Sequence, residues 1–130
     1  MKYISLNHNS APTSFKKAVI NGLAPDKGLY FPEKDVKLPK SFIESLKTLD
    51  NNEICYEVIS NYIDDEIPKN KLLEIVNDTI SFKIPLKKIE QSVYSLELFH
   101  GPTLAFKDIG AKFMASCLNY FKDSYTSKKI

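Results

Sequence analysis

The chain has 130 residues, of which 43% are hydrophobic and 26% charged, values that are typical of one modest globular domain. Its formal net charge is only +2 and lysines and acidic residues are interspersed, so no basic stripe is present and nucleic acid is not expected as a partner. No apolar stretch resembles a signal peptide or a bilayer span, which predicts a cytoplasmic protein without a membrane partner.

Two short β-prone segments near the N-terminus, residues 3–6 and 28–31, are predicted to pair with each other. A short helix is predicted between them. Ser14 suits its N-cap, and Gly22 suits the point where it ends. We interpret Gly22 and Gly28 as residues required by backbone geometry rather than as ligand contacts.

Residues 39–77 have a helical pattern. Ser41 with Glu44 predicts a capping box at the start of the first helix, and Asn51 or Asn52 is predicted to open the second. The second helix carries one wide apolar stripe that we predict to be core. The stripe consists of Ile54, Cys55, Val58, Ile59, Tyr62 and Ile63.

Pro68 suits the first turn of a third helix, where its missing N–H has no intrahelical partner. The charged residues around it are interpreted as a solvated connection. They are Asp64, Asp65, Glu66 and Lys69. The two cysteines, Cys55 and Cys117, lie among apolar helical neighbours, so we expect small hydrophobic residues rather than a disulfide or metal ligands.

After Thr79 the pattern becomes β-prone, at residues 80–82 and again at residues 93–99. A turn follows, and then a helix over residues 105–122 whose apolar residues cover most of its circumference and therefore require neighbours. Residues 124–130 are predicted to be a loop. A strand and a buried helix indicate an α/β fold, and we expect the chain to be an N-terminal piece of a longer enzyme.

Lys107 occupies an unusual position for a lysine, at the start of this apolar helix. Free N–H groups give a helix N-terminus a partial positive charge, which disfavours a cation and favours a neutral amine. The apolar neighbours Leu104, Phe106 and Ile109 are predicted to desolvate the amine. A lysine that acts as nucleophile or base needs these conditions.

The run LELFHGPTLAFKD, residues 96–108, resembles the Schiff-base lysine segment of threonine synthases, which are pyridoxal-phosphate (PLP) enzymes of fold type II. A second block resembles the opening segment of that family, in the same order. It comprises Tyr3-Ile4-Ser5, Ser14-Phe15, Ala18-Val19, Gly22-Leu23-Ala24, Asp26 and Gly28-Leu29-Tyr30-Phe31-Pro32.

The resemblance implies an α/β enzyme, of α+β character in this piece. Residues 1–92 correspond to an N-terminal domain, mostly helical with a short hairpin, and residues 93–130 to the truncated start of the PLP-binding domain with its fold type II sheet. The implied activity is that of a carbon–oxygen lyase acting on phosphates in threonine biosynthesis. It converts O-phospho-L-homoserine and water into L-threonine and phosphate.

On this resemblance Lys107 is the catalytic lysine and the covalent partner of PLP. Phe106 either packs on the pyridine ring or belongs to the core. His100 either acts directly in the site or orients the turn, and the Thr103 hydroxyl is expected to face the substrate. Asp108 is expected to offset the helix dipole rather than to transfer protons.

The chain departs from the family pattern because it has only four glycines and no Gly-rich phosphate loop. We therefore expect this piece alone to be inactive, and to self-associate through the exposed face of its last helix. Two alternatives stay open. One is another fold type II lyase or dehydratase that acts on an amino acid, and the other is a non-catalytic interaction domain.

Overall fold

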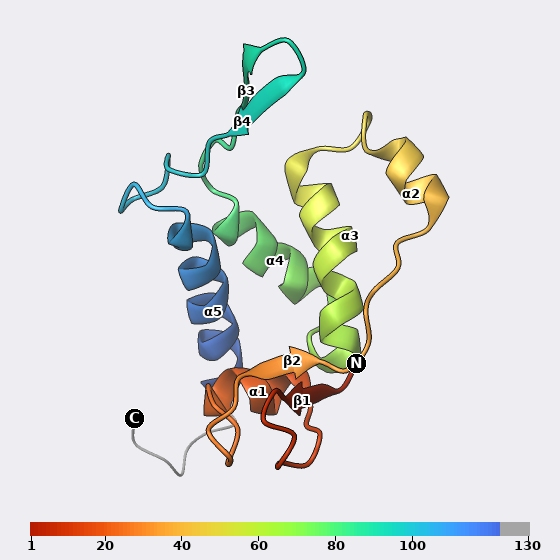
Figure 1. The fold of residues 1–130 in the computed structure, drawn as a ribbon, viewed down its shortest axis with the longest axis vertical. Coiled ribbons are helices and arrows are strands. Elements are labelled where there is room, and N and C mark those ends of the chain that lie inside the picture. Colours follow the sequence, from red (N-terminus) through yellow and green to blue (C-terminus); the bar gives the residue numbers. More distant parts are fainter. Residues whose placement is uncertain (123–130) are drawn as a thin grey trace.

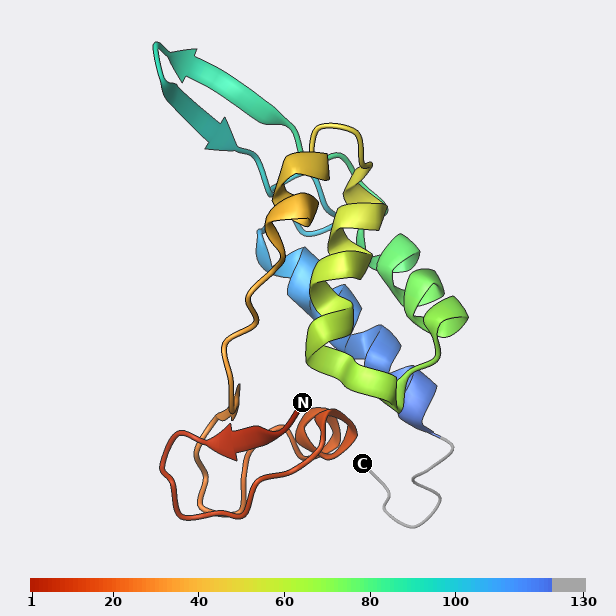
Figure 2. The same ribbon diagram turned by 90° about the vertical axis from the view of Figure 1, so that its right-hand side faces the viewer.

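The computed structural model describes residues 1–122, which form a mixed arrangement of helices and short antiparallel strands (Figure 1). In chain order the elements are β1 (Tyr3–Ser5), α1 (Phe15–Asn21), β2 (Tyr30–Pro32), α2 (Lys40–Ser45), α3 (Asn51–Ile63), the 3₁₀ turn η1 (Asp64–Glu66), α4 (Lys69–Thr79), β3 (Leu86–Glu90), β4 (Val93–Leu96) and α5 (Lys107–Phe121). Helices α3, α4 and α5 lie between the unit formed by β1, α1 and β2 and the projecting β3–β4 hairpin (Figures 1 and 2).

The predicted pairing of the two N-terminal segments is confirmed, because β1 pairs antiparallel with β2 and Tyr3 lies opposite Pro32. Helix α1 also has the predicted boundaries. The Ser14 hydroxyl accepts a hydrogen bond from the Lys17 N–H at 3.3 Å, as an N-cap does. Gly22 ends the helix at a φ of 68°, in the left-handed region that favours glycine.

Asp26 organises the loop that leads into β2. Its carboxylate accepts hydrogen bonds from the Ser5 hydroxyl at 2.7 Å, the Asn9 N–H at 2.9 Å and the Gly28 N–H at 3.0 Å. These bonds, with the Ser5 hydroxyl foremost, lower the pKa of Asp26. A Cβ atom on Gly28 would lie 2.1 Å from the Ser5 hydroxyl oxygen, so the glycine is needed for this close packing.

The capping box predicted at Ser41 and Glu44 is wrong. Helix α2 begins at Lys40, directly after Pro39, and no side chain caps it. Pro39 already holds the extended backbone of the cap position, which places Ser41 inside the helix.

A capping box occurs instead at the start of α3. The Asp50 carboxylate accepts from the Glu53 N–H and the Glu53 carboxylate accepts from the Asp50 N–H, both at 2.8 Å. Asn51 is the first helical residue, as predicted. Pro68 lies one position before α4 rather than within its first turn.

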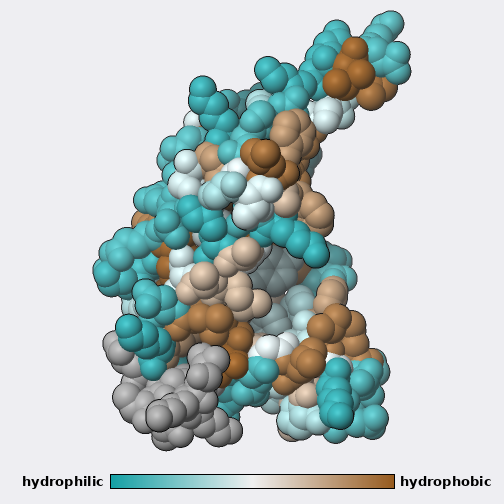
Figure 3. All heavy atoms as spheres, turned by 90° about the vertical axis from the view of Figure 1, so that its left-hand side faces the viewer, coloured by the Kyte–Doolittle hydropathy of each residue, from teal (hydrophilic) through white to brown (hydrophobic). Residues whose placement is uncertain are grey.

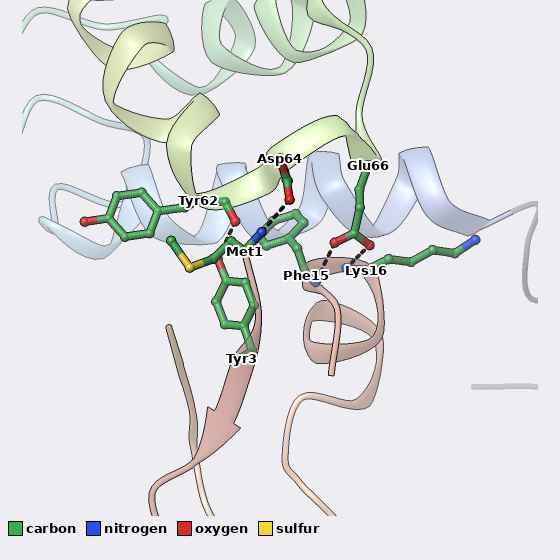
Figure 4. A network of polar contacts seen from close by, with 7 residues as sticks. All are labelled: Met1, Tyr3, Phe15, Lys16, Tyr62, Asp64 and Glu66. Atoms are coloured by element: carbon green, nitrogen blue, oxygen red, sulfur yellow. Dashed lines mark hydrogen bonds and ion pairs between the residues drawn. The ribbon is translucent and has the colours of Figure 1, made fainter. Parts of the chain in front are cut away.

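The acidic connection after α3 is not simply solvated, which corrects the interpretation drawn from its charges. Glu66 accepts hydrogen bonds from the backbone N–H groups of Phe15 at 2.7 Å and Lys16 at 3.1 Å, the first two residues of α1 (Figure 4). Asp64 binds the terminal ammonium of Met1. These two carboxylates fasten the N-terminal unit to the end of α3.

The core joins residues from both ends of the described chain. Phe15 on α1 packs against Phe121 on α5, with ring centroids 6.2 Å apart, and against Tyr3 on β1 at 5.8 Å. Cys117 on α5 is fully buried, and this burial raises the pKa of its thiol to about 12. The remaining buried apolar residues of the cluster are Ala18, Ile63, Ile67, Leu72, Ile75 and Val76.

The apolar stripe of α3 is buried completely only at Ile63. Its other members are partly buried, because α3 packs on α4 along one side only. Four of them, Ile54, Cys55, Val58 and Ile59, line an apolar groove of about 340 Å³ together with residues of α4 and α5. The prediction of a core stripe is thus confirmed at Ile63 and, for partly buried side chains that pack against the core, at Cys55 and Ile59.

The β-prone residues 80–82 do not form a strand, because the chain turns there at the end of α4. The strand predicted at residues 93–99 begins at Val93 as expected but ends at Leu96. It pairs with β3 in an antiparallel hairpin that projects from the helices (Figure 1). The hairpin exposes large apolar side chains, which are Leu86, Ile89, Val93, Tyr94 and Leu96. A small brown group stands among hydrophilic side chains at the projecting tip at the top of Figure 3.

Helix α5 has the neighbours that its apolar circumference required, since it packs against α4 and α1. No helix among residues 1–122 is long and apolar enough to cross a membrane. The loop predicted at residues 124–130 lies outside the described residues. The division of the chain at residue 92 stays a prediction.

Candidate functional site

The segment between β4 and α5 forms a tight turn immediately before Lys107. The Leu104 N–H donates to the Gly101 carbonyl at 3.1 Å, and the Asp108 N–H donates to the Ala105 carbonyl at the same distance. Leu104 has a φ of 57°, a left-handed conformation that is costly for a leucine. The backbone of the turn is therefore strained.

Asp108 is buried beneath this turn, with only 6% of its surface exposed. Its carboxylate accepts hydrogen bonds from the Thr103 N–H at 2.9 Å and from the Thr103 hydroxyl. The bond from the hydroxyl is the main reason that the pKa of Asp108 is lowered. The sequence predicted only a dipole role for Asp108, because nothing in the spacing alone revealed its contact with Thr103.

Gly101 packs directly against the same carboxylate. A Cβ atom at this position would lie 2.4 Å from Asp108 Oδ2 and 2.8 Å from Asp108 Cβ, both closer than van der Waals contact allows. The turn therefore requires glycine at position 101.

Lys107 is the first residue of α5, in agreement with its predicted place at a helix start. Its side chain is exposed, as are Phe106 at 64% and Leu104 at 75% of their surfaces. The predicted burial of the amine by apolar neighbours is therefore wrong for the described residues. Phe106 and Leu104 extend toward solvent instead of packing over the lysine.

His100 interacts with the end of the preceding strand. Its Nε2 lies 2.8 Å from Glu97 Oε2, and its ring lies 4.8 Å from the Phe99 ring. These contacts are those expected of a residue that orients the turn. Thr103 donates its hydroxyl proton to Asp108, so only lone pairs of that oxygen are available to a ligand.

Three of the four glycines among residues 1–122 have an evident structural role. Gly22 ends α1, Gly28 and Gly101 allow close packing, and Gly110 lies within α5. The nearby Lys112 is held by the Ser81 hydroxyl at 2.6 Å and by Asp78 at 3.7 Å. The lack of a Gly-rich phosphate loop in this chain stays a prediction from its sequence.

Comparisons with known proteins agree on one family. A family model described as the threonine synthase N terminus matches residues 2–80. Threonine synthase from Haemophilus influenzae is 41% identical over 118 residues, covering 91% of this chain and 27% of the relative. Threonine synthase from Escherichia coli is 39% identical over 120 residues, covering 92% of this chain and 28% of the relative. The chain thus spans just over a quarter of the length of these curated relatives.

Solved structures show the same relationship. The crystal structure of E. coli threonine synthase superposes with a TM-score of 0.88 at 38% identity, covering 94% of this chain and 28% of that one. A PLP-bound threonine synthase from Brucella melitensis superposes with a TM-score of 0.92 at 30% identity, covering 98% of this chain and 29% of that one. The chain belongs to the family of the threonine synthase N terminus.

Proposed function

We propose that the whole protein containing this chain converts O-phospho-L-homoserine and water into L-threonine and phosphate with PLP as its cofactor. The observation that carries this proposal is the placement of Lys107. The lysine of the HGPTLAFKD segment is exposed at the first residue of α5, directly after a strained turn. The PLP bound by the similar protein from B. melitensis supports the same cofactor.

The described residues fit PLP in part. Lys107 offers an exposed primary amine for the covalent link, and the exposed Phe106 ring beside it is free to stack on a flat heterocycle. The group that binds the cofactor phosphate must come from sequence beyond these residues. When bound, PLP supplies the electron sink that makes a substrate Cα proton removable.

The residues of the turn have separate roles in this proposal. The Lys107 Nζ, when neutral, takes up and returns substrate protons. The Thr103 oxygen accepts a hydrogen bond from a substrate N–H or O–H group, because its own proton is bonded to Asp108. His100, bonded to Glu97, holds the start of the turn rather than reacting.

Turnover assays on the whole protein test the reaction class. We expect phosphate and threonine to appear in equal amounts from O-phospho-L-homoserine, and no ammonia or keto acid from serine or threonine. The opposite substrate preference would indicate another fold type II lyase or dehydratase. Absence of both activities and of PLP binding would favour a non-catalytic interaction domain. The assignment to carbon–oxygen lyases acting on phosphates depends on the same assay.

The 130 residues alone are expected to produce no threonine, because they lack a phosphate cradle for the cofactor. The cytoplasmic location stays a prediction from the N-terminal sequence.

We expect the isolated chain to self-associate, since α5 leaves Met114 47% exposed and the preceding Phe106 64% exposed. Light scattering over a concentration series measures this directly. The apparent mass should rise with concentration for the wild type and fall toward 14.8 kDa for Met114→Lys. A wild-type chain that stays monomeric throughout the series contradicts the expectation.

A further inference from the structure

The turn before α5 cannot be held by local backbone preference. Leu104 has a φ of 57° and its side chain is 75% exposed, so packing of that side chain does not compensate for the unfavourable conformation. Helix α5 also begins without a side-chain cap at Phe106. Some other group must stabilise both the turn and the first residues of the helix.

Asp108 meets this requirement from the second position of α5. Its buried carboxylate receives two hydrogen bonds from Thr103, one from the backbone and one from the hydroxyl. Charge-assisted hydrogen bonds of this kind are stronger than those between neutral groups. The absence of a side chain at Gly101 lets the turn lie directly on the carboxylate.

We infer that Asp108 is a positioning residue for Lys107: its carboxylate closes residues 101–108 into one loop and thereby holds Lys107 at the start of α5. Lys107 immediately precedes Asp108, so any movement of the anchor moves the backbone that carries the amine. The role of Lys107 as the reactive lysine rests on the proposed function. The closure of the loop by Asp108 is independent of that function.

Substitutions at Asp108 and Thr103 distinguish the loss of the hydrogen bonds in the turn from the loss of the negative charge. Asp108→Ala removes both bonds to Thr103. Asp108→Asn removes the charge but retains a partner for each, because its carbonyl accepts from the Thr103 N–H while its amide donates to the Thr103 oxygen. Thr103→Val removes only the hydroxyl bond. This milder change replaces Asp108→Ala if that variant does not fold. The exposed Asp35 provides a matched control as Asp35→Ala.

Backbone order is the first measurement, from NMR relaxation and amide hydrogen exchange of the 130-residue chain. In Asp108→Ala we expect exchange at Thr103 and Leu104 to rise by about tenfold or more, corresponding to the loss of bonds to a charged group, and the backbone order of Lys107 to fall. Asp108→Asn should stay within about threefold of the wild type, and Thr103→Val should lie between them. Unchanged exchange at Thr103 and Leu104, or unchanged backbone order at Lys107, in Asp108→Ala would overturn the inference.

Trapping of lysines with PLP and borohydride, followed by peptide mass mapping, is the second measurement. The yield at Lys107 is divided by the yield at the exposed Lys88 of the hairpin in the same sample. We expect this ratio to fall about threefold or more in Asp108→Ala and to recover in Asp108→Asn, because a preorganised amine loses less freedom on reaction. If wild-type Lys107 is trapped faster than Lys88, a ratio unchanged in Asp108→Ala would mean that Asp108 merely stabilises the turn, and would also overturn the inference.

The two measurements distinguish failure of this inference from failure of the proposed function. If wild-type Lys107 is trapped no faster than Lys88, the chain gives no support to Lys107 as the PLP lysine. The positioning role is then decided by backbone order at Lys107, which must still fall in Asp108→Ala and recover in Asp108→Asn.

Discussion

Replacing Lys107 with alanine in the whole protein is expected to lower threonine formation by about a thousandfold or more, the scale typical of losing a group that acts in the chemical step. The proposed function requires this amine twice, as the covalent partner of PLP and as the group that moves substrate protons. The nearby Lys112 is not available to replace it, because Ser81 and Asp78 hold its ammonium group.

Threonine and phosphate should be measured together, with PLP content determined on the same samples. Lys88→Ala is the matched control, since Lys88 is exposed on the projecting hairpin, and its activity should stay within about twofold of the wild type. A Lys107→Ala protein that retains more than about a tenth of wild-type turnover would remove this lysine from the mechanism.

Replacing Glu66 with alanine is expected to lower the free energy of unfolding by about 2–4 kcal/mol, because bonds to a charged acceptor contribute about 1.5–3 kcal/mol each and this site is partly solvated. The change leaves the Phe15 and Lys16 N–H groups without their partner at the start of α1. Phe15 carries the packing between β1, α1 and α5, so its displacement should weaken the shared core.

Thermal and urea unfolding followed by circular dichroism measure this effect, and a fall in Tm of about 10 °C is expected for a chain of this size. Glu66→Gln, which keeps one acceptor oxygen, should lose less. Glu57→Ala on the exposed face of α3 is the control and should stay within about 0.5 kcal/mol of the wild type. Equal stability of the Glu66→Ala and Glu57→Ala variants would show that the contact in Figure 4 does not fasten the two units.

Features that depend on a few adjacent residues were predictable from the sequence. The β1–β2 pairing, the Ser14 cap and the Gly22 terminus were predicted and are confirmed. The cap and the terminus depend on local backbone preference and on hydrogen bonds that reach only a few residues along the chain. The pairing joins residues as far apart as Tyr3 and Pro32, and it was predictable because both segments are β-prone. The position of Lys107 at a helix start was predictable for the same reason.

Two predictions from local sequence patterns failed, because another residue or segment determined the structure at that place. The pattern of Ser41 and Glu44 fits a capping box, yet Pro39 starts α2 before it. Residues 80–82 are β-prone, but among residues 1–122 no strand pairs with them, and β4 pairs with β3 instead. A strand needs a partner for its backbone groups, which propensity alone does not provide.

The sequence by itself determined the pairing of β1 with β2, the Ser14 cap, the Gly22 terminus and the place of Lys107, because those depend mainly on the backbone preference of short segments and on hydrogen bonds within one turn. Only the tertiary structure decided that Glu66 binds the start of α1, about 50 residues earlier in the chain, and that Asp108 anchors the turn at Thr103. It also decided that Lys107 and Phe106 are exposed rather than buried. Burial and polar contacts of this kind depend on which surfaces meet in space, and that is not encoded in the spacing of residues along one helix.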